Sequence, residues 1–278
     1  MIARLIKIDF HMGAVGAGPV ILGVVLASLA GLLDVYGTIA AFGLPCDQMS
    51  FADNFAAIMA GSPPHSPRPG VLFLPPLQWT LLLILMHYLT LSYPYRDISG
   101  IGQQMLLRCR SRRDWWISKC LWTIGMTLIA FAAVVLTAGL WAFAFGQSFS
   151  VEIHEEMLSY IGVSGDLIRQ PKTFGLGFIL AAPVVLAGMA LLQMVLSVLV
   201  RPSVSFVLTL IALIASSYTQ SPLLLGNYLM AVRCGDMAAG GVSPLTGAAL
   251  GIALCLVSAF VGYHLLSNLD LIDREWSA

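Results

Sequence analysis

The stretch Phe174–Val200 reads FGLGFILAAPVVLAGMALLQMVLSVLV and carries no charged side chain. A helix rises about 1.5 Å per residue, so a helix of this length exceeds the ~30 Å hydrocarbon core of a bilayer. About 20 mainly apolar residues are enough to cross that core. The stretch therefore predicts a transmembrane helix, and it decides the class of the chain.

Five other segments have the same character, and together they predict six spans with both termini on one side of the membrane. The six segments are Gly18–Phe42, Val71–Tyr93, Trp116–Phe145, Phe174–Val200, Ser203–Tyr218 and Leu245–Leu266. The last contains Gly247-x-x-x-Gly251, a small-residue motif typical of close helix packing. No segment between the spans is long enough to fold around its own core, so residues 1–278 predict a single transmembrane domain.

The composition of the chain leads to the same class. Of the 278 residues, 58% are hydrophobic and only 10% are charged. A soluble domain carries about 25% charged residues, because its surface must face water. Soluble enzymes, disordered proteins and fibrous proteins are therefore excluded, and we expect an all-α integral membrane protein. The 14 basic residues balance the 14 acidic ones, so no surface for nucleic acid is indicated.

Lysine and arginine divide unevenly between the two sets of loops, ten against four. The ten are Arg4, Lys7, Arg96, Arg108, Arg110, Arg112, Arg113, Lys119, Arg201 and Arg274, and the four are Arg68, Arg169, Lys172 and Arg233. Cytoplasmic loops carry the excess of positive charge. Both termini are therefore predicted to be cytoplasmic, and the opposite loops are acidic.

Met1–His11 precedes the first span and has the pattern of a helix that lies in the cytoplasmic interface. Its apolar arc is Ile2, Leu5, Ile6 and Phe10, and its basic arc is Arg4, Lys7 and His11. Asp9 interrupts the pattern because it projects into the apolar arc. The alternative is a short positive flank that only sets the topology.

The loop Pro94–Lys119 combines five arginines with signs of local structure. Gln103–Cys109 predicts a short helix, and Ser111-x-x-Asp114 has the pattern of a capping box that starts a new one. A loop that supplies only charge needs neither feature. We therefore expect this loop to dock a specific partner, the alternative being a topology signal.

A second short segment, Ser221–Cys234, follows the fifth span on the outer side. Ser221 can cap a helix whose first residue is Pro222, and the apolar run behind it is too short to cross the membrane. We expect a re-entrant or interfacial helix, forming an outer hairpin before the last span. The alternative is that the segment extends the fifth span.

Few ionisable residues lie within the spans, and Asp34, His87 and His264 are among them. Each is close enough to an interface to be solvated, which argues against a proton relay at the midplane. Cys46 and Cys234 fall in outer loops, where an oxidising milieu permits a disulfide.

Sequence motifs for enzymatic chemistry are absent. There is no G-x-x-x-x-G-K-[ST] loop for a nucleotide, and His154-Glu155-Glu156 lacks the second histidine of H-E-x-x-H. We expect no catalytic residue, no metal site and no cofactor in this chain.

These parts together resemble the permease subunit of bacterial ABC-2 type (type V) exporters. The resemblance covers the whole chain in topology and two segments in motif. Gly102–Lys119 resembles the arginine-rich stretch in which a coupling helix leads into the third span, and Leu225–Met230 resembles a Gly-Asn-Tyr segment of the outer re-entrant region. The short fifth span and Asp9 are departures from the pattern.

The resemblance implies two permease chains, identical or paralogous, above a cytoplasmic ABC ATPase dimer that holds ATP and Mg²⁺. The residues it implies for coupling to the ATPase are Gln103, Met105, Leu106, Arg108, Arg110, Arg112 and Arg113. Spans two and five would line the substrate path, with Leu83, Met86, His87, Phe206 and Leu210 in its walls. Such apolar walls suit an amphiphilic peptide, drug or lipid, exported across the bacterial cytoplasmic membrane.

Two other classes stay open at this point. One is a proton-coupled secondary transporter that uses Asp34, His87 and His264. The other is a membrane sensor or immunity protein that binds a peptide without transporting it.

Overall fold

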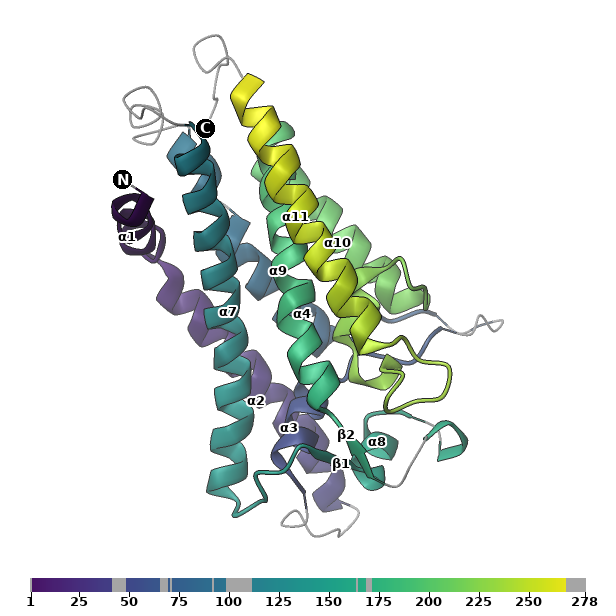
Figure 1. The fold of residues 1–278 in the computed structure, drawn as a ribbon. Coiled ribbons are helices and arrows are strands. Elements are labelled where there is room, and N and C mark those ends of the chain that lie inside the picture. Colours follow the sequence, from purple (N-terminus) through teal and green to yellow (C-terminus); the bar gives the residue numbers. More distant parts are fainter. Residues whose placement is uncertain are drawn as a thin grey trace.

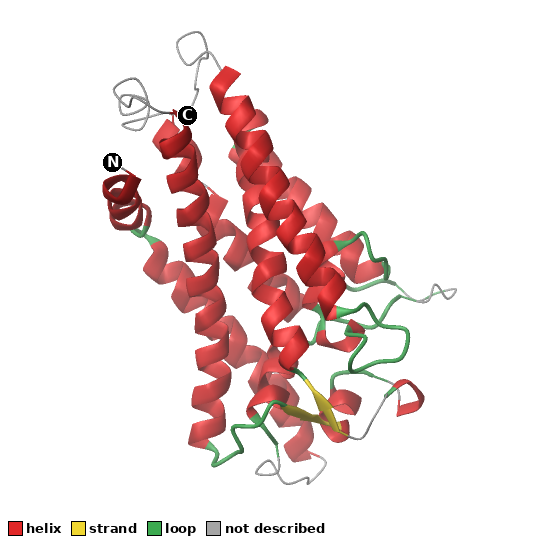
Figure 2. Cartoon of the chain, viewed as in Figure 1, coloured by secondary structure: helices red, strands yellow, loops and turns green. Residues whose placement is uncertain are grey.

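The computed structural model describes residues 2–41, 49–65, 70, 72–91, 93–98, 112–163, 165–168 and 172–268. Over these ranges the chain forms a bundle of long helices (Figure 1), with two short strands and most of the loops gathered toward one end (Figure 2).

The elements follow one another in a simple order. They are α1 (Ile2–Gly13), α2 (Ala17–Ala41), α3 (Phe51–Ile58), α4 (Leu77–Leu91), α5 (Tyr93–Ile98), α7 (Arg112–Ala144), β1 (Glu152–His154), α8 (Glu155–Tyr160), η2 (Gly165–Leu167), β2 (Lys172–Phe174), α9 (Leu176–Leu199), α10 (Pro202–Tyr218), η3 (Leu225–Leu229), η4 (Ala231–Arg233) and α11 (Pro244–Asn268). The strands β1 and β2 pair antiparallel, with Glu152 opposite Phe174.

Helices lie at all six positions where the sequence predicts spans, as α2, α4, α7, α9, α10 and α11. Four of them, α2, α7, α9 and α11, are long and apolar enough to cross a membrane. Helices α4 and α10 have 15 and 17 residues, fewer than the ~20 that a span normally needs. The chain is thus a helical membrane protein with four clear candidate spans.

The expected segment Val71–Tyr93 is wrong at its start, because residues 72–76 are not helical. Pro75 and Pro76 explain the difference, since the residue before a proline is pushed out of the helical region. The carbonyl of Pro76 then accepts the hydrogen bond of Thr80 N, so the helix begins directly behind the prolines.

The small elements divide the bundle into two unlike ends. Helix α1, drawn nearly end-on in Figure 1, lies at the end where α7 begins and α11 finishes. Helices α3 and α8 and the strand pair lie at the opposite end (Figure 1). We call these the α1 end and the cap end.

Helices α9 and α11 form the closest pair of long helices. A Cβ on Gly188 would lie 2.8 Å from Gly251 O, and a Cβ on Gly251 would lie 2.9 Å from Val184 O. Only glycine allows the two backbones to approach so closely, as is common between membrane helices. The packing motif that the sequence predicts at Gly247 and Gly251 is therefore confirmed at Gly251.

The outward faces of the long helices are apolar. Exposed examples are Leu22 and Leu33 on α2, Leu136, Leu140 and Phe143 on α7, Ile211 on α10, and Leu256 and Phe260 on α11. A water-soluble protein rarely exposes contiguous apolar surface on this scale. The faces suit contact with lipid and agree with the assignment as a membrane protein.

The helix predicted from Ser221 is wrong in kind. The segment forms a turn at Pro222–Leu223 followed by the short 3₁₀ helices η3 and η4. The backbone N–H of Ala231 donates to Met59 O and that of Val232 to Ala60 O. Because these donors bond to another loop, they are not available for the bonds of a continuous α-helix.

Candidate functional site

Three charged side chains meet in the interior at the α1 end. Lys119 Nζ, from α7, lies 2.5 Å from Asp9 Oδ1 of α1 and 2.7 Å from Asp97 Oδ2 of α5. The exposed fractions of these side chains are 1% for Lys119, 6% for Asp9 and 15% for Asp97. We call Asp9, Asp97 and Lys119 the ion cluster.

Neighbouring polar and aromatic groups complete the hydrogen bonds of the ion cluster. Tyr93 Oη donates to Asp9 at 2.8 Å, Ser118 Oγ also donates to Asp9, and Trp115 Nε1 donates to Asp97 at 3.1 Å. The lysine ammonium lies 4.6 Å from the centroid of the Tyr93 ring and 5.0 Å from that of Trp115. Buried charges persist only when they are paired and hydrogen-bonded in this way.

The ion cluster joins three helices, α1, α5 and α7. Asp9 is therefore the residue that ties α1 to the bundle, although the sequence marks it only as an interruption of an apolar arc. Lys119 is likewise buried inside α7, which corrects its assignment to the exposed positive loops. Removing one member of a buried pair typically costs about 3–5 kcal/mol, because it leaves an uncompensated buried charge, so the three members of the ion cluster depend on one another.

Most of the predicted coupling residues lie outside the described residues. They are Gln103, Met105, Leu106, Arg108 and Arg110, and Ser111 of the predicted capping box lies there too. Arg112 and Arg113 open α7. Arg112 Nη1 donates to Leu266 O at 3.0 Å and to Ser267 O at 3.1 Å, whereas Arg113 is exposed.

The predicted pathway residues are placed within or against the core. Leu83, Met86 and His87 of α4 are buried, while Phe206 and Leu210 of α10 are half-buried. The Phe206 ring lies 6.2 Å from that of Tyr88, so α4 and α10 do meet at this level. The two cavities described below, one at the cap end and one between α7 and α11, are lined by other residues.

Asp34, His87 and His264 are not brought together. Asp34 and His264 are exposed, as expected. The expectation that His87 is solvated is wrong: it is 2% exposed, and its Nδ1 lies 2.9 Å from Leu83 O. Its Nε2 has no hydrogen-bond partner among the described residues.

At the cap end a single cation, Arg233, is 1% exposed. Its guanidinium donates to six oxygen atoms, which are the carbonyls of Ser62, Pro63, Ser216, Ser217 and Thr219 and the Oδ1 of Asn227. Three of these carbonyls come from the C-terminal end of α10, where carbonyls lack partners within a helix. Burial lowers the pKa of Arg233 to about 10, so it stays charged at neutral pH. Arg233 thus fastens α10 to the loop before α4.

Neighbouring Cys234 is buried and forms no disulfide with any cysteine that the structure describes. Cys46 lies outside the described residues, so the disulfide between the two stays a prediction.

Two further sets of polar side chains form hydrogen bonds at the cap end. Tyr36, Asn54 and Gln147 form a closed ring of hydrogen bonds, with 2.5 Å from Tyr36 Oη to Asn54 Oδ1 and 2.9 Å for each of the others. Asp53 accepts a hydrogen bond from the backbone N–H of Ser50, the N-cap of α3, and its Oδ2 lies 2.6 Å from His154 Nδ1. Burial raises the pKa of Asp53, and the hydrogen bonds from His154 oppose that rise.

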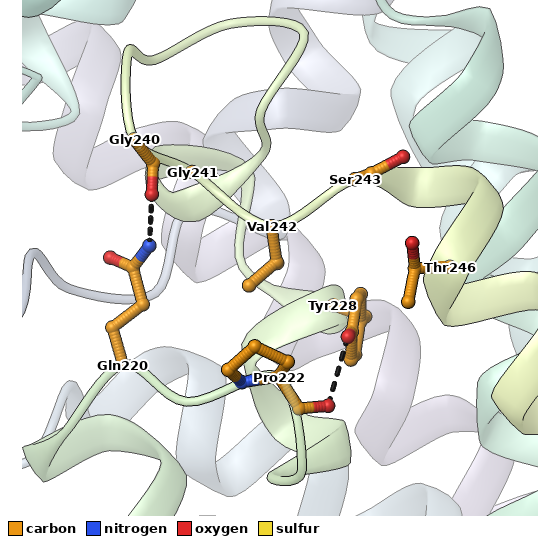
Figure 3. A pocket seen from close by; sticks show the side chains of 8 residues that line it. All are labelled: Gln220, Pro222, Tyr228, Gly240, Gly241, Val242, Ser243 and Thr246. Atoms are coloured by element: carbon orange, nitrogen blue, oxygen red, sulfur yellow. Dashed lines mark hydrogen bonds between the residues drawn. The ribbon is translucent and has the colours of Figure 1, made fainter.

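A cavity of about 580 Å³ opens at the cap end between η3 and the start of α11. Figure 3 shows its lining, in which Gln220 Nε2 donates to Gly240 O at 2.6 Å and Tyr228 Oη to Pro222 O at 2.9 Å. The residues around it are uncharged, including the hydroxyl groups of Ser243 and Thr246. The cavity therefore offers hydrogen bonds without a charged group for catalysis.

Sequence reasoning missed the pairing of Asp9 with Lys119 and the role of Arg233. The same sequence signal could have indicated both. Each is a charged residue within an apolar stretch, and such a residue requires a buried partner.

A family model described as "Protein of unknown function (DUF2705)" matches residues 37–272. No curated protein and no solved structure matches the chain. The matched range contains Asp97 and Lys119 of the ion cluster, and α1 with Asp9 precedes it.

Proposed function

The chain belongs to the DUF2705 family, and we propose that it is the membrane-spanning permease subunit of an ATP-driven exporter. In this proposal all six long helices cross the bacterial cytoplasmic membrane and both termini are cytoplasmic. A cytoplasmic ABC ATPase dimer binds at the α1 end, and a second permease chain, identical or paralogous, completes the transporter.

The observation that carries the proposal is the ion cluster. It joins α1, α5 and α7 through buried charges, and α5 and α7 flank residues 99–111 in the sequence. Arg108 and Arg110 lie within that segment, and they are two of the seven residues that the resemblance assigns to coupling. A force on residues 99–111 therefore acts on α5 and α7, which the ion cluster links to each other and to α1. Coupling of an ATPase to membrane helices requires such a link.

The proposed substrate is an amphiphilic peptide, drug or lipid-like molecule. Supporting this class, the α4–α10 face is apolar, with Tyr88, Val207 and Ile211 exposed along it. A sugar polymer or an inorganic ion would need polar partners that this face does not offer.

The test is purification of the tagged chain from its source membranes in mild detergent. We expect an ABC ATPase in stoichiometric amount and Mg-ATP hydrolysis by the complex, stimulated by an amphiphilic peptide. Two results together would favour the secondary transporter. One is purification of the chain alone, and the other is uptake of a fluorescent amphiphile into inverted vesicles, where a protonophore abolishes the uptake although ATP is present. The chain alone without uptake would favour the sensor.

A further inference from the structure

An apolar groove lies between α7 and α11 at the α1 end. It has a volume of about 290 Å³, and its walls include Ile117 and Leu121 of α7 and Phe260 of α11. Leu121 and Phe260 are 43% and 64% exposed, so the groove opens toward the surface that faces lipid. Along α7 it extends from residue 113 to residue 121, about 12 Å of helix axis.

The groove has a fixed floor. The Trp116 indole is 2% exposed, and its Nε1 donates to Ala259 O at 2.8 Å. A Cβ on Gly262 would lie 2.0 Å from a carbon of the same ring, so the indole lies directly on the backbone of α11. The two helices are therefore held at a set spacing beside the groove.

A cation stands at the mouth of the groove. Arg113 lines it, is exposed, and forms no ion pair with any residue that the structure describes. Its neighbour Arg112 is engaged with the last carbonyls of α11, which fixes the mouth. Asp114 is turned by about 100° from Arg113 around the helix.

We propose that this groove binds an anionic phospholipid, with one acyl chain in the groove and the phosphate on Arg113. The acyl chain of such a lipid matches the apolar walls and its phosphate matches the exposed guanidinium of Arg113, which binds phosphate oxygens in a forked geometry. Basic sites between helices at the cytoplasmic surface are typical of anionic lipid binding. The inference rests on the membrane placement of the chain and not on the exporter role.

Native mass spectrometry of the purified chain tests the lipid site. The chain is released from detergent after incubation with equal amounts of phosphatidylglycerol and phosphatidylcholine that carry identical acyl chains. We expect about fivefold more phosphatidylglycerol bound, the preference expected from one interfacial arginine. Arg113→Gln should bind both lipids equally, and Arg113→Lys should keep most of the preference.

Two further variants make the result specific to the groove. Arg4 is an exposed arginine of α1 that does not line this groove, so Arg4→Gln should keep the preference. Leu121→Trp fills the groove from an exposed position and should remove the bound lipid while the circular dichroism of the chain is unchanged. Equal binding of both lipids by the wild-type chain, or a preference that survives Arg113→Gln, would overturn the proposal.

Discussion

Both ends of the bundle bury a cation, but they neutralise it in different ways. At the α1 end, Lys119 faces two carboxylates that come from two other helices. At the cap end, Arg233 faces neutral oxygens, most of them backbone carbonyls. A lysine acts as a compact point charge, whereas the planar guanidinium distributes its donors over several acceptors.

This difference separates a local structural role at the cap end from a connection between helices at the α1 end. The carbonyls around Arg233 belong to loops and to the end of α10, so the arginine defines the local shape of the cap. The ion cluster instead connects whole helices through their side chains, beside direct packing of α1 on α7 such as that of Phe10 against Gly125. In the proposed exporter, a displacement of α5 or α7 would pass to α1 through these side chains.

The largest effect is expected at Arg233. Arg233→Leu removes six hydrogen bonds; Ser217 O and Thr219 O keep a second donor in Ser62 Oγ and Asn227 Nδ2, and each buried acceptor left unsatisfied costs about 1–3 kcal/mol. We expect the free energy of unfolding to fall by about 5 kcal/mol or more, measured by thermal unfolding in detergent. Arg233→Lys keeps the charge with fewer donors and should be intermediate. A wild-type unfolding temperature for Arg233→Leu would refute the assigned role of this arginine.

A somewhat smaller effect is expected at the ion cluster. Lys119→Met leaves two buried carboxylates without a counter-charge, which should cost about 3–5 kcal/mol of unfolding free energy. The triple variant Asp9→Asn, Asp97→Asn, Lys119→Met removes all three charges and should recover most of the loss.

Lys7 supplies the matched control, because it is exposed on α1. Lys7→Met should change the unfolding free energy by less than about 0.5 kcal/mol. If Lys119→Met were equally mild, the ion cluster would not hold α1 to the bundle.

The smallest effect concerns the pH dependence of the cap end. Burial raises the pKa of Asp53 above 3.8, so the folded chain binds this proton more tightly than the unfolded chain does. Stability from this group should therefore fall as the pH rises from 3.8 through the raised pKa, and Asp53→Asn should abolish that fall. The His154 ring lowers the pKa of Asp53, so His154→Phe should raise that pKa further and extend the fall in stability to higher pH. Unfolding temperatures measured across acidic pH test both variants. Identical pH profiles for the wild-type chain, Asp53→Asn and His154→Phe would contradict the raised pKa of Asp53.

The sequence predicts the positions of the long helices because apolar length is a local property. It places α2, α7, α9 and α11 to within a few residues at most ends, and it misses the start of α4, where Pro75 and Pro76 override the apolar run. It cannot predict that Asp9 meets a lysine 110 positions away, since that depends on how α1 packs. Nor can it predict the acceptors of Arg233, because backbone carbonyls leave no trace in the sequence.

The expected re-entrant helix fails for a related reason. Ser221 and Pro222 carry the local pattern of a helix start, but the N–H groups of Ala231 and Val232 bond to the loop behind α3. Tertiary hydrogen bonds therefore decide the segment, and no local pattern predicts them.

The most direct test of ATP-driven export through the α1 end is Mg-ATP hydrolysis by the purified complex after charge reversal of the docking segment. Arg108→Glu with Arg110→Glu is compared with Arg4→Glu, which reverses an exposed charge on α1. We predict that the double variant loses the ATPase and its hydrolysis. Its unfolding temperature should stay at the wild-type value, because the sequence predicts a surface loop for both arginines and surface ion pairs contribute only about 0–1 kcal/mol. Arg4→Glu should retain both. Full retention of the ATPase and of hydrolysis by the double variant would contradict the account.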